Sequence, residues 1–209
     1  MNIRLVLSLL LALALAACGG PKHQPLPAGA TVLVLGDSVS HGTGAGPGED
    51  YPTLLAARTG WRIVNAGVPG ATSADGLERL PDQLDRNTPR LVLVELGGND
   101  FLRQVPRPQT VTNLKAILEE CRKRGIPAVL IAVPRPSLAG AVIGHLSDDP
   151  IYRELAKSTA TPVIEDVLSD VLSSDDLKAD HIHPNAAGYR KLAQGLQAEL
   201  HALGFLRSE

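Results

Sequence analysis

Four residues with useful chemistry stand in short polar segments of this 209-residue chain. Ser38 lies in GDSV, Asn99 lies in GGND, and Asp180 and His183 lie in DHIHP. A serine hydroxyl is a weak nucleophile near neutral pH, and it reacts only when a base lies within hydrogen-bonding distance. Imidazole is the side chain whose ordinary pKa suits that task. These residue types would therefore allow attack by a hydroxyl group, provided that the fold brings them together.

Apolar runs predict the elements that would position these residues. Continuous β-branched and aliphatic runs, typical of strands that are buried on both faces, lie at 31–35, 62–65, 91–96 and 128–133, with a weaker run at 162–164. Helical patterns lie at 51–59, at 74–86 with Ser73 as N-cap, at 111–124 between Thr110 and Gly125, at 150–157, and at 185–203 before Gly204. This alternation predicts one α/β domain, a three-layer doubly wound sandwich with a five-stranded parallel sheet in the flavodoxin-like order 2-1-3-4-5.

The predicted sheet order indicates where a site would form. In doubly wound sheets, ligands bind beyond the carboxyl ends of the strands, where the strand order reverses. The segments that follow the first three strands are 36–39, 65–73 and 97–100. They bear a hydroxyl, a glycine-rich backbone and an amide. The segment 180–185 adds a carboxylate and imidazoles immediately before the last helix.

The four segments, in this order, resemble the sequence blocks of the SGNH (GDSL) hydrolase family. GDSV matches the first block, the turn at Gly70 the second, GGND the third, and Asp180-x-x-His183 the last. The resemblance covers about residues 30–203. It is strongest to the bacterial thioesterase I, lysophospholipase and arylesterase branch, because 76–81 (GLERLP) and 91–100 (LVLVELGGND) closely match the sequence of that branch. It implies the SGNH hydrolase fold.

The resemblance also implies a mechanism. Ser38 would be the nucleophile, His183 its base, and Asp180 the carboxylate that orients the imidazole. The backbone N–H groups of Ser38 and Gly70 and the side chain of Asn99 would form the oxyanion hole. The expected activity is hydrolysis of short to medium acyl esters through an acyl-enzyme, with thioesters as an open option. No cofactor is expected, and no metal, because no cluster of His, Cys and carboxylates has metal-site spacing.

Several of these residues also have a simpler structural interpretation. Ser38 could cap a helix after the first strand, Asn99 could cap a turn, and Asp37 is expected to brace the turn that it shares with Ser38. Gly67 is an alternative to Gly70 in the second block. These alternatives stay open at the level of sequence.

Two further histidines compete for roles at the site. His181 could replace His183 as the base, although its position directly after Asp180 is expected to point its ring away from the serine hydroxyl. His41, three residues after Ser38, could line a pocket or lie in a solvated loop.

The substrate pocket is predicted only in outline. In the resembled branch the loop after the third block and the segment before the last block border the acyl chain, which here corresponds to Phe101, Leu102 and 138–146. Ordinary packing is the alternative interpretation of these apolar residues. The glycine-containing stretch between Pro134 and Pro150 could form a lid.

The N-terminus resembles a bacterial lipoprotein signal. Residues 5–17 form an apolar stretch too short to span a bilayer, and LAAC ends it at Cys18. The resemblance implies a removed signal peptide at 1–17, a lipidated Cys18 with a tether at 18–29, and a hydrolase domain at 30–209. Gly19 favours the outer membrane, with the membrane face undecided. An ordinary signal peptide is the alternative.

Composition excludes other classes of function. The net charge of −2 excludes a strongly basic nucleic-acid binder. Aromatic residues make up only 3% of the chain, too few to build stacking surfaces for single-stranded nucleic acid or sugar rings. A lipidated Cys18 would leave Cys121 as a buried thiol with no disulfide. Two functions remain as alternatives to the esterase: an O-deacetylase of cell-envelope polysaccharide, and a non-catalytic envelope lipoprotein that uses the fold for binding.

Overall fold

One parallel sheet organises the domain. The computed structural model describes residues 23–135 and 144–207, and it places five strands in the order β2-β1-β3-β4-β5. The strands are β1 (Thr31–Gly36), β2 (Arg62–Gly67), β3 (Leu91–Glu95), β4 (Ala128–Ile131) and β5 (Val163–Ile164). Every neighbouring pair is parallel. The sheet and its strand order, predicted from the alternation of elements, are confirmed.

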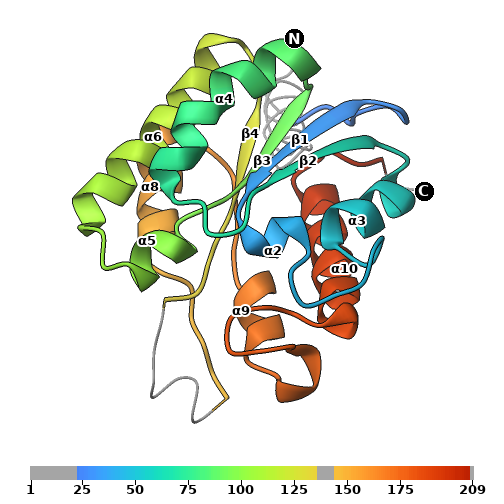
Figure 1. Cartoon of the computed structure of the whole chain (residues 1–209). Helices are drawn as coiled ribbons and strands as arrows, with labels where there is room; N and C mark the ends of the chain where they lie inside the picture. Colours follow the sequence, from blue (N-terminus) through green and yellow to red (C-terminus); the bar gives the residue numbers. More distant parts are fainter. Residues whose placement is uncertain (1–22, 136–143, 208–209) are drawn as a thin grey trace, which may run out of the picture.

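Helices cover both faces of this sheet, as Figure 1 shows. One face is covered by α4 (Ser73–Asn87), α6 (Arg107–Lys123) and α8 (Ile151–Thr159), and the other by α3 (Tyr51–Thr59) and α10 (Ala186–Ala202). Because both faces are covered, all five residues of β3 and five of the six in β1 are buried. This burial explains why the two central strands are continuous apolar runs rather than alternating ones.

Short helices occupy the carboxyl edge of the sheet. They are α2 (Ser38–His41), α5 (Gly98–Leu102), α9 (Val167–Leu172) and the 3-10 helix η1 (Asp175–Leu177). None was predicted from the sequence, because one or two helical turns carry too little hydrophobic periodicity to be recognised.

Two predicted helix starts are wrong. The N-cap of α4 is Thr72 rather than Ser73, and Thr72 forms a capping box with Asp75. Helix α6 begins at Arg107 rather than after Thr110, which lies buried inside it. Pro106 and Pro108 lie at the start of this helix, and a helix tolerates proline in its first turn, where the missing N–H would have no partner.

Cys121 lies in the core, with 0% of its surface exposed. Burial raises the pKa of its thiol to about 12, so the thiolate is not formed near neutral pH. The predicted buried thiol is therefore confirmed. Within residues 23–135 and 144–207, no helix combines the length and the apolar character needed to cross a bilayer.

Candidate active site

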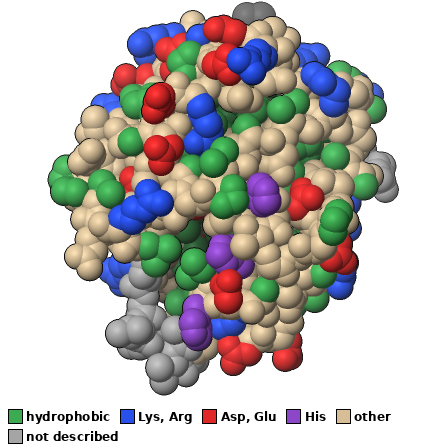
Figure 2. Space-filling model, in the orientation of Figure 1, with side chains coloured by type: hydrophobic (Ala, Val, Ile, Leu, Met, Phe, Trp, Pro, Cys, Tyr) green, Lys and Arg blue, Asp and Glu red, His purple; other side chains and the backbone are tan. Residues whose placement is uncertain are grey.

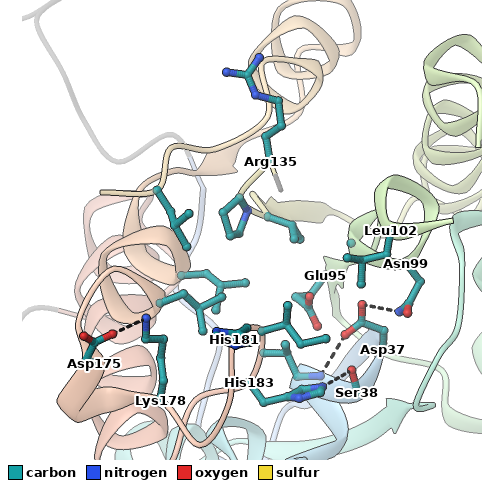
Figure 3. Close-up of a pocket in the computed structure, with 18 residues that line it drawn as sticks. Asp37, Ser38, Glu95, Asn99, Leu102, Arg135, Asp175, Lys178, His181 and His183 are labelled. Carbon is teal, nitrogen blue, oxygen red and sulfur yellow. Dashed lines mark hydrogen bonds and ion pairs between the residues drawn. The ribbon is translucent and has the colours of Figure 1, made fainter. Parts of the chain in front are cut away.

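Ser38, His183 and Asp180 form a continuous chain of hydrogen bonds at the carboxyl edge of the sheet. Ser38 Oγ lies 2.9 Å from His183 Nε2 (Figure 3). His183 Nδ1 lies 2.7 Å from Asp180 Oδ2. If Nδ1 carries the ring proton, it donates to the carboxylate and leaves Nε2 free to accept from the hydroxyl. The arrangement has the geometry that a serine nucleophile requires.

The loop that carries Asp180 and His183 is closed at its base. Lys178 and Pro184 form an antiparallel bridge, and the N–H of Ala179 donates to the carbonyl of His183 at 2.9 Å. Asn185 then begins α10, because its Oδ1 accepts from the first-turn N–H groups of that helix at 2.9 and 3.0 Å. His183 and Asp180 are thus held by one loop, closed by backbone hydrogen bonds, rather than by two separate elements.

Asp180 is held in its ionised form. Partial burial acts to raise the pKa of Asp180, but hydrogen bonds from the His183 ring and from two backbone N–H groups outweigh burial and lower it. Those N–H groups belong to Ile182 and His183, at 2.8 and 2.9 Å from Asp180 Oδ1. His181 lines the adjacent cavity, and no hydrogen bond among the described residues joins it to Ser38. The imidazole that meets the hydroxyl is that of His183.

Ser38 is the first residue of α2 rather than its cap. Asp37 occupies the N-cap position, and its Oδ1 accepts from the N–H of Val39 at 2.9 Å. The prediction that Asp37 braces this turn agrees with that contact. No hydrogen bond within the described part of the chain uses the Ser38 N–H. Because first-turn N–H groups lack partners inside the helix, this one can donate to an anion.

The two candidate glycines of the second segment have different surroundings. The N–H of Gly67 donates to Asn65 Oδ1 at 2.9 Å, and a Cβ at Gly67 would lie 2.4 Å from the backbone nitrogen of His41. Gly67 therefore allows β2 and α2 to approach closely. Gly70 has a φ of 79°, and its carbonyl accepts from the side chain of Arg103 at 2.8 Å. No hydrogen bond among the described residues uses the Gly70 N–H.

Asn99 lies in the first turn of α5, beside the turn that carries Ser38. Its Nδ2 donates to Asp37 Oδ2 and to the carbonyl of Ala71, each at 3.0 Å. These contacts tie together the turns that follow β1, β2 and β3. They place the amide of Asn99 beside the N-terminal end of α2 (Figure 3).

A buried polar network beneath Ser38 was not predicted from the sequence. Glu95, at the end of β3, is 1% exposed, and its Oε2 accepts from Ser40 Oγ at 2.7 Å. Ser40 Oγ also lies 2.7 Å from the hydroxyl of Tyr51. Burial, followed by the nearby charge of Asp37, raises the pKa of Glu95 well above its ordinary value, which favours the neutral acid. The one charged residue inside LVLVEL was the signal that could have revealed it.

An apolar cavity of about 610 Å³ opens beside Ser38 (Figures 2 and 3). Leu102 lines it as predicted, but Phe101 does not and instead packs edge-on against Tyr152. His41 is exposed and lies outside the lining. Of the predicted segment 138–146 and the predicted lid, residues 136–143 lie outside the described residues. The apolar lining consists of Val39, Leu102, Val133, Pro134, Leu146, Leu168, Leu172 and Ile182.

The described residues offer no obvious metal centre. Within 23–135 and 144–207, no group of three or more His, Cys, Asp or Glu side chains is placed to hold a metal ion.

Comparisons with known proteins agree on one family. The model of the GDSL-like Lipase/Acylhydrolase family matches residues 34–191. The chain is 34% identical over 178 residues to the thioesterase 1/protease 1/lysophospholipase L1 of Escherichia coli, covering 83% of this chain and 84% of that protein. It is 33% identical over 180 residues to the esterase TesA of Pseudomonas aeruginosa, covering 83% and 89%.

Solved structures give the same result. A crystal structure of TesA matches with a TM-score of 0.74 and 32% identity, covering 83% of this chain and 99% of that one. AlinE4, an SGNH-hydrolase family esterase, matches with a TM-score of 0.64 and 34% identity, covering 84% and 97%. The family match spans the residues from β1 into α10, including all four segments that meet at the carboxyl edge. The chain therefore belongs to the GDSL-like lipase/acylhydrolase family, the SGNH hydrolases, and is a carboxylic ester hydrolase.

Proposed function

We propose that this protein is a lipid-anchored serine esterase that cleaves short to medium acyl esters through a Ser38-His183-Asp180 triad. The observation that carries the proposal is the hydrogen-bond chain from Asp180 to Ser38, which ends at the mouth of an apolar cavity. A hydrophobic cavity beside the nucleophile suits an aliphatic acyl chain, because burial of each CH₂ contributes about 0.8 kcal/mol.

In the acylation step, Ser38 Oγ attacks the ester carbonyl carbon as His183 Nε2 takes the hydroxyl proton. The negative charge that develops on the carbonyl oxygen is stabilised by the N–H groups of Ser38 and Gly70 and by the amide of Asn99. Collapse of this tetrahedral intermediate breaks the bond to the leaving alkoxide, which receives the proton from His183. The products are an alcohol and an acyl-Ser38.

Deacylation repeats these steps with water. His183 takes a proton from water as the water oxygen attacks the acyl carbon, and it returns that proton to Ser38 Oγ when the ester bond breaks. The free carboxylic acid leaves. Throughout the cycle the ionised Asp180 stabilises the imidazolium and holds its orientation. A thioester would follow the same course with a thiolate as the leaving group.

The first test is the Ser38→Ala variant with p-nitrophenyl esters. We expect hydrolysis to fall to background while the fold, followed by circular dichroism, is unchanged. Ser158→Ala is the matched control, because its hydroxyl donates to the carbonyl of Leu155 and Ser158 does not line the cavity beside Ser38. Full activity in Ser38→Ala would overturn the proposed mechanism.

Two measurements separate this activity from its alternatives. Rates on acyl chains of increasing length should rise beyond acetyl and then fall as the cavity fills, whereas a polysaccharide O-deacetylase would prefer acetylated glycan. A fluorophosphonate probe should label Ser38 in the wild-type protein. A binding protein without catalytic function would not be labelled.

The anchoring half of the proposal rests on the LAAC segment ending at Cys18. Removal of residues 1–17 and acylation of Cys18 would give stable attachment, since two or more acyl chains bind a bilayer far more tightly than one. Mass spectrometry of the N-terminal peptide should show a diacylglyceryl and an acyl group. Membrane fractionation should place the protein in the outer membrane, and Cys18→Ser should release it.

A further inference from the structure

The chain enters the domain at the amino edge of the sheet, opposite the active site. His23 stacks on Phe205 with ring centroids 4.3 Å apart, and the N–H of Leu26 donates to the carbonyl of Phe205 at 2.9 Å. The N–H of Gly29 then bonds the carbonyl of Gly60 at 2.7 Å, immediately before β1. Figure 1 shows this segment at the upper end of the sheet, with α2, α5 and α9 at the lower end.

Cys18 lies only five residues before His23. An extended chain spans at most ~3.6 Å per residue, so an acylated Cys18 lies within about 18 Å of this edge. A membrane anchor at that residue therefore brings the amino edge of the sheet close to the lipid surface.

Exposed cations surround this point of entry. Helices α3, α4, α6 and α8 all end at this edge and carry a basic residue in the last turn. Other basic residues lie at the start of strands β2 and β3 or follow α10. The exposed cations of the amino edge, which we call the basic edge, are Arg58, Arg62, Arg90, Lys115, Arg122, Lys123, Lys157 and Arg207.

These cations lack carboxylate partners. None of the ion pairs within residues 23–135 and 144–207 includes a member of the basic edge. Three carboxylates of the same region, Asp82, Asp85 and Glu120, bind Arg86 and Arg124 instead. Glu119 and Glu199 also lie near this edge, so cations outnumber carboxylates there without excluding them. The basic edge therefore keeps its positive charge available for an external anion.

The opposite edge carries an excess of carboxylates. Around the mouth of the cavity, the segments from the end of β5 to the loop before α10 carry Glu165, Asp166, Asp170, Asp175, Asp176 and Asp180. The cations of this region are fewer: Arg153 pairs with Glu165, Lys178 pairs with Asp175, and Arg135 lines the cavity. Figure 2 shows acidic side chains at this lower end, together with histidines and a basic side chain, and a mixture of acidic and basic side chains at the upper end. A molecule with this polarity orients in the field of a charged surface.

Stabilisation of helix ends explains only part of the basic edge. Cations near a helix C-terminus interact favourably with the helix dipole, which accounts for Arg58, Arg122, Lys123 and Lys157. Arg62 and Arg90 lie at strand starts, Lys115 lies in mid-helix and Arg207 follows α10, so none of these four gains from a helix end.

We propose that the basic edge lies on the anionic phospholipid surface of the membrane that anchors the protein, so that the active-site mouth faces away from that membrane. This inference rests on the proposed acylation of Cys18. Each Lys or Arg near an anionic bilayer adds attraction, and the acidic edge around the mouth is repelled. The substrates reached first are then water-soluble esters or esters in a facing layer, rather than lipids of the anchoring leaflet.

The test uses the chain from Cys18 onward, which contains every described residue, coupled through the Cys18 thiol to a maleimide phospholipid in vesicles. Cys121 is buried and does not compete for the reagent. Because the anchor is synthetic, the result does not depend on acylation in cells, which the mass of the N-terminal peptide reports separately. Vesicles contain phosphatidylcholine alone or mixed with phosphatidylglycerol.

The readout is the rate at which an acetylating reagent modifies individual lysines. On phosphatidylglycerol vesicles we expect severalfold slower modification of Lys115, Lys123 and Lys157, with no change at the exposed Lys191 near the opposite end of the domain. Protection should disappear on neutral vesicles and in about 1 M salt, where screening acts over about 3 Å. Equal rates on both kinds of vesicle, or protection of Lys191, would overturn the proposal.

Charge variants control for the anchor itself. Arg62→Glu with Arg122→Glu should abolish protection and leave p-nitrophenyl ester hydrolysis unchanged, because neither residue touches the cavity. The matched pair Arg190→Glu with Lys191→Glu, on α10, should leave the protection intact. If the edge instead binds only a polyanionic glycan offered on the vesicles, phosphatidylglycerol gives no protection and the proposal is wrong.

Discussion

Asn99 Nδ2 lies 3.0 Å from Asp37 Oδ2, so the proposed oxyanion-hole amide is oriented by the residue that precedes Ser38. The second N–H of the same amide is taken by the carbonyl of Ala71. Both donors are therefore in use before a substrate arrives. A developing oxyanion competes best with the neutral carbonyl of Ala71, while the contact with Asp37 keeps the amide in place.

Asn99→Ala should lower kcat by about 10²–10³, with a smaller effect on KM, because an oxyanion-hole donor acts mainly in the transition state. Steady-state kinetics on a p-nitrophenyl ester measure this split. Asn113→Ala is the matched control: its amide contacts Ser73 Oγ, outside the cavity, and its loss should leave kcat unchanged. A rise in KM alone would contradict the assigned role of Asn99.

Asp180→Asn should lower kcat by about 10⁴, since an amide cannot stabilise the imidazolium and favours the wrong imidazole tautomer. Asp176, an exposed carboxylate four residues before Asp180, offers a control with the same change of side chain. Asp176→Asn should retain the wild-type kcat. If both variants lose activity equally, general loss of negative charge rather than the triad would explain the effect.

Glu95 should make the protein less stable as pH rises. Its pKa lies well above the ordinary value of 4.5 in the folded state, so its contribution is fully present below that value and is lost as pH rises toward the folded pKa. The loss is up to about 1.4 kcal/mol per pH unit for one proton. Glu95→Gln resembles the neutral acid and should lack this loss.

Thermal unfolding of the wild-type protein and of Glu95→Gln at about pH 5 and about pH 8 checks this prediction. The difference in free energy of unfolding should move in favour of the glutamine variant at the higher pH. Parallel curves would show that Glu95 is ionised in the folded protein.

The cavity should set the acyl-chain preference. Leu172→Trp places a larger side chain in the lining and should shift the best p-nitrophenyl ester toward shorter chains. The control is Val68→Trp, at a position 47% exposed and outside the cavity, which should keep the wild-type profile. An unchanged profile for Leu172→Trp would place the acyl chain elsewhere.

Much of the fold could be predicted from local pattern. The runs at 31–35 and 91–96 are apolar throughout because helices cover both of their faces, and alternation with helices then restricts the strand order. The start of α6 could not be read in this way, because Pro106 and Pro108 look like loop residues even though a first helical turn accepts them. The resemblance assigns Phe101 to the cavity, but its ring packs edge-on against Tyr152 instead.

By itself the sequence determined the class of the protein: the strand order, the four polar segments and the family follow from residue types and their spacing along the chain. Only the tertiary structure decided which atoms meet. The 2.9 Å contact of Ser38 with His183 spans 145 positions, and the carboxyls of Asp37, just after β1, and Glu95, at the end of β3, come together. Burial and distance depend on packing between elements, so the raised pKa of Glu95 and the charge polarity of the two edges arise only once the sheet is assembled.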